Sequence, residues 1–166
     1  MFGGKANGYR NDLHSYDIQT NTWTKIETIK SPTPRYGHTA VAYSGIMYLF
    51  GGYDNMAFCS NELCRFDLTT QAWLEPIRFA QIEERFHHSV CLNENIMYVS
   101  GGRDNGKKVF NSIYAINLDT LECTTLPPFP QARFGHVSYF NETIHLFGGC
   151  NHEKDFNLLG IEHTTD

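Results

Sequence analysis

The chain has 166 residues, with 13 Lys and Arg against 18 Asp and Glu, and a formal net charge of -5. Because 41% of its residues are hydrophobic and only 19% are charged, it can bury a core, which excludes a disordered chain. The acidic excess, without any run of Lys or Arg, excludes a surface for nucleic acid or anionic membranes. No apolar run reaches the roughly 18 residues that span a bilayer, and the N-terminus lacks a signal-peptide layout, so we expect a cytoplasmic protein without membrane contact.

Short apolar or alternating segments, separated by glycine and polar turns, run along the whole chain. This pattern is typical of β-strands, and no long stretch has the 3.6-residue period of a helix. We therefore predict an all-β fold of short antiparallel strands. In chain order the expected strands include Leu13–Asp17, His38–Tyr43, Ile46–Phe50, Leu63–Asp67, Ala72–Ile77, Ile96–Ser100, Ile113–Asn117 and Thr143–Phe147.

Several motifs recur with a period of about 50 residues. The motif Arg-aromatic-(Gly or His)-His begins at Arg35, Arg85 and Arg133, at spacings of 50 and 48 residues. A Trp follows each of the first two glycine pairs, at Trp23 and Trp73, seven residues after an aromatic residue. The pair Gly-Gly occurs four times, at spacings of 48, 50 and 47 residues. The pairs are Gly3 with Gly4, Gly51 with Gly52, Gly101 with Gly102, and Gly148 with Gly149.

Together these spaced motifs resemble the kelch repeat, over nearly the whole chain from Phe2 to about Ile161. The family implies a kelch-type β-propeller, in which each repeat forms one blade of four antiparallel strands. In such blades the paired glycines let backbone segments approach closely. We expect Trp23 and Trp73 to fill the wedge between neighbouring blades, and the motif histidines to satisfy backbone groups rather than bind metal.

A blade that begins at the motif arginine divides the chain into four segments. Residues 1–30 then hold the last two strands of a partial blade, 31–80 and 81–130 are complete blades, and 131–166 hold the first two strands of a further blade, with a third around Leu158–Ile161. About three blades cannot close a ring, for which propellers need about four to eight, so we expect a fragment of a longer protein. The alternative is a head-to-tail dimer that closes a six-bladed ring by joining complementary end strands.

The resemblance to kelch substrate receptors of cullin ubiquitin ligases suggests a function for the rim before each first strand. In those receptors, arginines at this repeat position help to bind acidic peptide motifs, because guanidinium groups bind carboxylates in charge-assisted pairs. We therefore expect a non-catalytic module that binds protein partners, as substrate receptor or adaptor of a ubiquitin ligase. The expected contact residues are Arg35, Tyr36, Arg85, Phe86, Arg133 and Phe134 at the rim, and Tyr53, Asp54, Arg103 and Asp104 in the loops after the second strands.

Three alternatives stay open. The arginines can instead tie blades together through backbone carbonyls and acids such as Glu83. Some kelch proteins are actin-binding or signalling scaffolds, and the domain that would discriminate lies outside these residues. A third is a metal-dependent kelch enzyme of the oxidase or specifier type. Because adjacent strand residues point to opposite faces, His87 and His88 would not share a metal, and we predict no catalytic residue, cofactor or metal site.

Overall fold

The computed structural model describes residues 1–54, 56–151 and 161–163. Within these ranges the regular secondary structure consists of β-strands alone, as the sequence predicts, and no helix is present that could cross a membrane. Most expected boundaries are met closely, because tight turns at Gly45, Asn95 and the Thr-Thr-Gln stretch fix where each hairpin reverses. Ile46–Phe50, Ile96–Ser100 and Ile113–Asn117 are strands with the expected ends.

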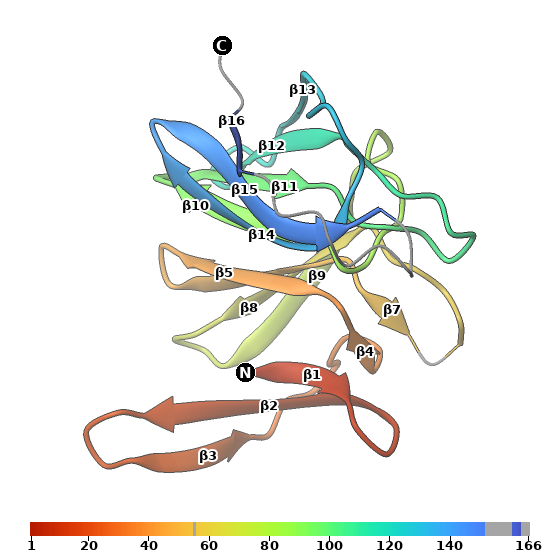
Figure 1. Ribbon diagram of the computed structural model, residues 1–166. Helices are drawn as coiled ribbons and strands as arrows, with labels where there is room; N and C mark the ends of the chain where they lie inside the picture. The colour runs from red at the N-terminus through yellow and green to blue at the C-terminus, as the bar shows by residue number, and fades with distance from the viewer. Residues whose placement is uncertain (55, 152–160, 164–166) are drawn as a thin grey trace.

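Four antiparallel sheets stack face to face and form the layers of Figure 1, and we number them blades I to IV. Each runs from its inner to its outer edge in chain order. Blade I consists of β1 (Phe2–Lys5), β2 (Tyr9–Asp17) and β3 (Thr22–Ile26). Blade II consists of β5 (Thr39–Tyr43), β6 (Ile46–Phe50), β8 (Glu62–Asp67) and β9 (Ala72–Arg78), and the short strands β4 (Arg35–Tyr36) and β7 (Tyr53–Asp54) pair beside it. Blade III consists of β10 (Ser89–Asn93), β11 (Ile96–Ser100), β12 (Ile113–Asn117) and β13 (Cys123–Leu126), and blade IV of β14 (Phe134–Asn141), β15 (Thr143–Cys150) and β16 (Ile161–His163).

The N-terminal end piece has one strand more than the two expected of it. Blade I has a third strand, because β1 pairs with β2 from Phe2 opposite Leu13 to Lys5 opposite Tyr9. The residues around the first glycine pair are long enough to form the first strand of this hairpin. Because they pair with Tyr9 and Arg10, β2 begins at Tyr9 and not at the expected Leu13. In blade IV, β16 adds to β15, while residues 158–160 of the expected third strand lie outside the described residues. With β1 present, blade I offers three strands to a head-to-tail dimer instead of two, and the six-bladed dimer itself stays a prediction.

Apolar side chains fill the space between successive blades. Leu13 of blade I meets Phe66 of blade II in one cluster, and Phe50 of blade II meets Ile116 of blade III in the next. Because neighbouring residues of a strand point to opposite faces, every blade supplies one set of apolar side chains to each neighbour. The core therefore consists of blade-to-blade layers, as expected of a repeat architecture.

The paired glycines sit where these layers touch. A Cβ on Gly51 would lie 2.7 Å from the Arg85 carbonyl oxygen of the next blade, and one on Gly101 would lie 2.5 Å from the Arg133 carbonyl oxygen. The second glycine of each pair donates a hydrogen bond to the same carbonyl, at 2.9 Å from Gly52 nitrogen. Only a residue without a side chain permits this approach.

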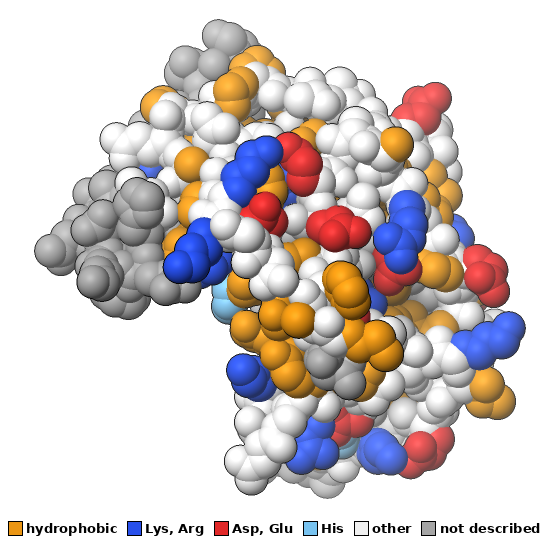
Figure 2. Space-filling view, turned by 90° about the vertical axis from the view of Figure 1, so that its right-hand side faces the viewer, with side chains coloured by type: hydrophobic (Ala, Val, Ile, Leu, Met, Phe, Trp, Pro, Cys, Tyr) orange, Lys and Arg blue, Asp and Glu red, His pale blue; other side chains and the backbone are white. Residues whose placement is uncertain are grey.

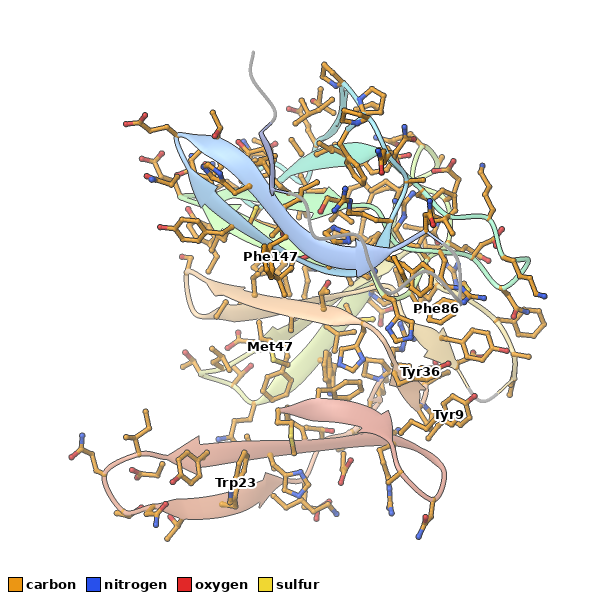
Figure 3. The ribbon with its side chains drawn as sticks, in the orientation of Figure 1. Tyr9, Trp23, Tyr36, Met47, Phe86 and Phe147 are labelled. Atoms are coloured by element: carbon orange, nitrogen blue, oxygen red, sulfur yellow. The ribbon has the colours of Figure 1, made fainter. Side chains whose placement is uncertain are left out.

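The outward faces of the two end blades are uncovered by any described blade. Trp73 of β9 packs against Phe2 of blade I, with ring centroids 5.3 Å apart, whereas Trp23 of β3 is 58% exposed. At the other end, Phe147 of β15 is 55% exposed, while Phe50 at the same repeat position is fully buried. Figure 3 labels Trp23 and Phe147 on these two outer layers.

Candidate functional site

The three motif arginines are buried, although they were expected to contact a partner. Arg35, Arg85 and Arg133 have 2%, 0% and 1% of their surface exposed. Each donates a hydrogen bond to the carbonyl of the first glycine in its own blade, at 3.0, 2.8 and 2.9 Å respectively. Arg35 also pairs with Glu62 at 3.2 Å, and Arg85 with Glu83 at 2.9 Å. We therefore assign these arginines to the framework and leave them out of the contact surface.

The motif histidines also belong to the blade junctions. The His88 ring nitrogen Nε2 lies 2.7 Å from the Thr39 hydroxyl of the preceding blade, and His136 Nε2 lies 3.0 Å from the Ser100 hydroxyl. Burial first, and then the charge of the neighbouring arginine, lowers the pKa of His136 and of His38 to about 4. These rings are therefore neutral at physiological pH and serve as packed hydrogen-bonding groups.

A hollow of about 360 Å³ opens on the side of the molecule where the inner ends of blades I to IV meet. In Figure 3 the labelled Phe86, Tyr36 and Tyr9 follow one another along this side. We call this hollow the aromatic mouth. Its lining residues are Lys5, Tyr9, Tyr36, Tyr53, Phe86, His87, Arg103, Asn105 and Phe134.

One backbone pairing, repeated in three blades, builds the aromatic mouth. The motif aromatic of each blade lies opposite the residue that follows the glycine pair: Tyr36 opposite Tyr53, Phe86 opposite Arg103, and Phe134 opposite Cys150. The rings then pack across blades, with centroids 5.9 Å apart for Tyr36 and Phe86 and 5.6 Å apart for Tyr9 and Tyr36. Burial raises the pKa of Tyr36, so its phenol keeps the proton and can donate a hydrogen bond.

Two cations flank the rings. The Lys5 ammonium lies 5.2 Å from the ring centroid of Tyr9 and 5.3 Å from that of Tyr36. The Arg103 guanidinium lies 5.4 Å from the Phe86 centroid and 5.0 Å from the Phe134 centroid. The aromatic mouth thus combines rigid apolar rings with positive charge, a combination suited to an anionic group beside an apolar one.

The loop after β7 extends the aromatic mouth outward. Met56 and Phe58 are exposed at its tip, and the Asn105 amide donates a hydrogen bond of 2.8 Å to the Ala57 carbonyl, which ties this loop to blade III. Figure 2 looks onto this side and shows hydrophobic side chains gathered in its middle. The acids of these loops bond within the loops themselves: Asp54 accepts hydrogen bonds from the backbone amides of Met56 and Phe58, and Asp104 from that of Lys108.

The structure thus collects only part of the expected contact set. Tyr36, Tyr53, Phe86, Arg103 and Phe134 meet in the aromatic mouth, while the framework arginines and the two loop aspartates do not line it. Sequence reasoning missed four lining residues. The repeat alignment could have found two of them, because Lys5 follows the first glycine pair as Tyr53 and Arg103 follow later ones, and His87 stands in the motif itself. The residues missed are Lys5, Tyr9, His87 and Asn105.

The stacked sheets of three or four strands, their glycine-pair junctions and the buried motif arginines define a kelch-type β-propeller. The solved structure of YjhT has this fold at a TM-score of 0.78, with 18% identity, over 99% of this chain and 63% of that chain. The family model described as the KLHDC2/KLHL20/DRC7 Kelch-repeats domain matches residues 1–149. The chain belongs to this kelch-repeat family.

Individual relatives match shorter segments. Kelch domain-containing protein 3 of Rattus norvegicus is 36% identical over 62 residues, which cover 36% of this chain and 16% of the relative. Host cell factor 2 of Homo sapiens is 41% identical over 54 residues, which cover 32% of this chain and 7% of the relative. The matches thus span only a small part of these relatives. Kelch domains generally serve as protein-interaction modules. In the part of the chain that the structure describes, no three His, Cys, Asp or Glu residues gather as metal ligands.

Proposed function

We propose that this kelch domain binds a protein partner by taking an acidic peptide segment into the aromatic mouth. The observation that carries the proposal is that two cations lie over the rings of one hollow, Lys5 over Tyr9 and Tyr36, and Arg103 over Phe86 and Phe134. Such a site attracts carboxylates through its cations and offers rigid apolar area that costs little conformational entropy on binding. The exposed Met56 and Phe58 beside it would contact apolar residues that flank the acidic segment.

The setting we propose is a cytoplasmic substrate receptor or adaptor of a ubiquitin ligase, without chemistry of its own. An actin-binding or signalling scaffold is the alternative, since the same mouth would serve either role. Identifying the partner distinguishes the two, because a receptor is expected to bind short acidic segments of several proteins, and a scaffold one persistent partner.

Selection of random peptides against the purified chain tests the proposal. We expect enrichment of Asp or Glu next to apolar residues. The selected peptides should bind the Lys5→Gln and Arg103→Gln variants about tenfold more weakly, the loss expected when a hydrogen bond to a charged group is removed. Lys25→Gln, which removes an exposed cation from β3, is the control and should bind normally. Peptides without acids, or equal binding by all variants, would contradict the proposal.

A further inference from the structure

His87 occupies a place that glycine holds in the other repeats. The motif reads Arg-aromatic-Gly-His at Gly37 and Gly135, but Arg-Phe-His-His at His87. Backbone hydrogen bonds link these three residues from blade to blade. The His87 nitrogen donates to the Gly37 carbonyl and the Gly135 nitrogen donates to the His87 carbonyl, both at 2.8 Å. The fold therefore imposes the same backbone on all three.

That backbone favours glycine. The φ angles are 65° at Gly37, 54° at His87 and 69° at Gly135, all in the left-handed region that side chains with a Cβ avoid. His87 thus takes a strained conformation at a position where both neighbouring blades have glycine. Nine other non-glycine residues of the described chain have a positive φ, but they lie in turns and loops and none of them lines the aromatic mouth, as His87 does.

The imidazole is also positioned for a ligand. It lines the aromatic mouth, with its ring centroid 4.8 Å from that of Phe86, 5.5 Å from that of Tyr36 and 6.4 Å from that of Phe134. No described residue forms a hydrogen bond with its ring nitrogens, in contrast to His88 beside it, which bonds Thr39. Burial first, and then the charge of Arg103, lowers the pKa of His87.

We infer that His87 contacts the ligand and determines specificity by forming a hydrogen bond with a carboxylate in the aromatic mouth. The grounds are its strained backbone, the break in the repeat and its ring nitrogens, which no described residue binds. This inference rests on the proposed function and deepens it. A carboxylate beside the imidazole offsets the repulsion from Arg103, and so ligand binding is coupled to protonation of His87. The other charged or titratable groups beside the ring are Lys5, Tyr9, Tyr53 and Arg103 of the aromatic mouth, the Tyr36 phenol, whose pKa burial raises, and His88, whose pKa burial holds well below its ordinary value.

The test uses the full chain and two probes, the blocked peptides tetraglutamate and tetraglutamine. NMR follows the His87 ring proton during a pH titration with and without peptide. We expect tetraglutamate to raise the pKa of His87 by about 0.5, which by linkage makes binding to the protonated form about threefold tighter. Tetraglutamine should leave that pKa unchanged. Affinity for tetraglutamate should therefore fall as the pH rises through the pKa of His87, by about threefold in total between full protonation and pH 8.

Two variants separate ligand contact from structure. His87→Gly installs the residue of the equivalent positions, so it should unfold at the same or a higher temperature, yet bind tetraglutamate several-fold more weakly with a flat pH profile. His87→Asn, which tolerates the left-handed backbone, should retain part of the affinity and also lose the pH dependence. If tetraglutamate does not bind the wild-type chain, the proposed function and this inference both fail. If it binds, and Arg103→Gln weakens it while His87→Gly leaves affinity and pH profile unchanged, only the role of His87 is overturned.

Discussion

At the scale of single residues, the motif arginines hold each blade together at the rim. Arg85 donates to the Gly101 carbonyl, to the Ser112 hydroxyl at 3.1 Å and to Glu83, from a fully buried position. Removing the Arg85 side chain leaves the buried Gly101 carbonyl without this donor, whereas the half-exposed Glu83 keeps its contacts with Tyr114 and Lys108. The repetition of this arginine therefore indicates a contribution to stability.

We expect Arg85→Ala to lower the free energy of unfolding by about 3 kcal/mol. Arg78→Ala is the matched control, because the Arg78 side chain is largely exposed while it pairs with Glu62, and it should cost less than about 1 kcal/mol. Urea unfolding of both variants provides the comparison. Equal effects of the two substitutions would contradict the framework role of Arg85.

The junction histidines make stability depend on pH. The pKa of His38 and of His136 is about 4 in the folded chain, against an ordinary value of 6.5, so the unfolded chain binds more protons between these values. The free energy of unfolding should therefore be constant above about pH 7 and fall between pH 6.5 and 4, by up to about 1.4 kcal/mol per pH unit for each histidine. Urea unfolding at pH 7.5, 6 and 5 measures this slope, and a flat profile would refute it.

At the scale of elements, the glycine pairs set the distance between blades. Gly101 and Gly148 hold the same repeat position and both have a left-handed φ, of 56° and 72°, but only Gly101 lies against a following blade. No atom of the described residues lies within 4 Å of the position that a Cβ on Gly148 would take. An alanine at either site would therefore strain the backbone, but only an alanine at Gly101 would also collide with the next blade.

Comparison of Gly101→Ala with Gly148→Ala isolates that collision. We expect Gly101→Ala to lower the free energy of unfolding by about 2 kcal/mol more than Gly148→Ala does, because overpacking of a tight contact costs about 1 to 3 kcal/mol. Chemical denaturation of both variants gives the difference. Similar losses would mean that the backbone conformation, and not the approach of the next blade, requires these glycines.

The exposed end faces give a second matched pair. Phe50→Ala removes a fully buried ring between blades II and III and should cost about 3 to 5 kcal/mol. Phe147→Ala, at the same repeat position on the uncovered face of blade IV, should cost about 1 kcal/mol or less. Thermal or urea unfolding tests this, and a large loss from Phe147→Ala would show that this face is covered in solution.

The elements could be predicted well because strand period and turn chemistry are local. Ile46–Phe50 is flanked by turn residues that fix both ends, so its limits follow from the sequence alone. The burial of Arg85 could not be read in this way, because a charged residue at a repeat position fits a framework and a binding site equally. Lys5 and Tyr9 were missed for a related reason: their approach to Tyr36 depends on how blade I stacks on blade II, which no local pattern encodes.

At the scale of the whole molecule, the repeat places equivalent residues of successive blades side by side at one end. The framework residues of the motif turn inward and hold the junctions, whereas the residues that vary between repeats, such as Lys5, His87 and Arg103, collect in the aromatic mouth. Function is expected where a repeat departs from its own pattern on a surface that several blades share. The binding of an acidic partner segment at this place is the central claim.

Chemical-shift mapping of the backbone amides during titration with blocked tetraglutamate tests that claim most directly. We predict saturable shifts concentrated at the residues that line the aromatic mouth, and a much weaker response to tetraglutamine. The outer strands β3, β9 and β13 should stay unchanged. Absence of saturation, equal responses to both peptides, or shifts centred on the outer strands would contradict the account.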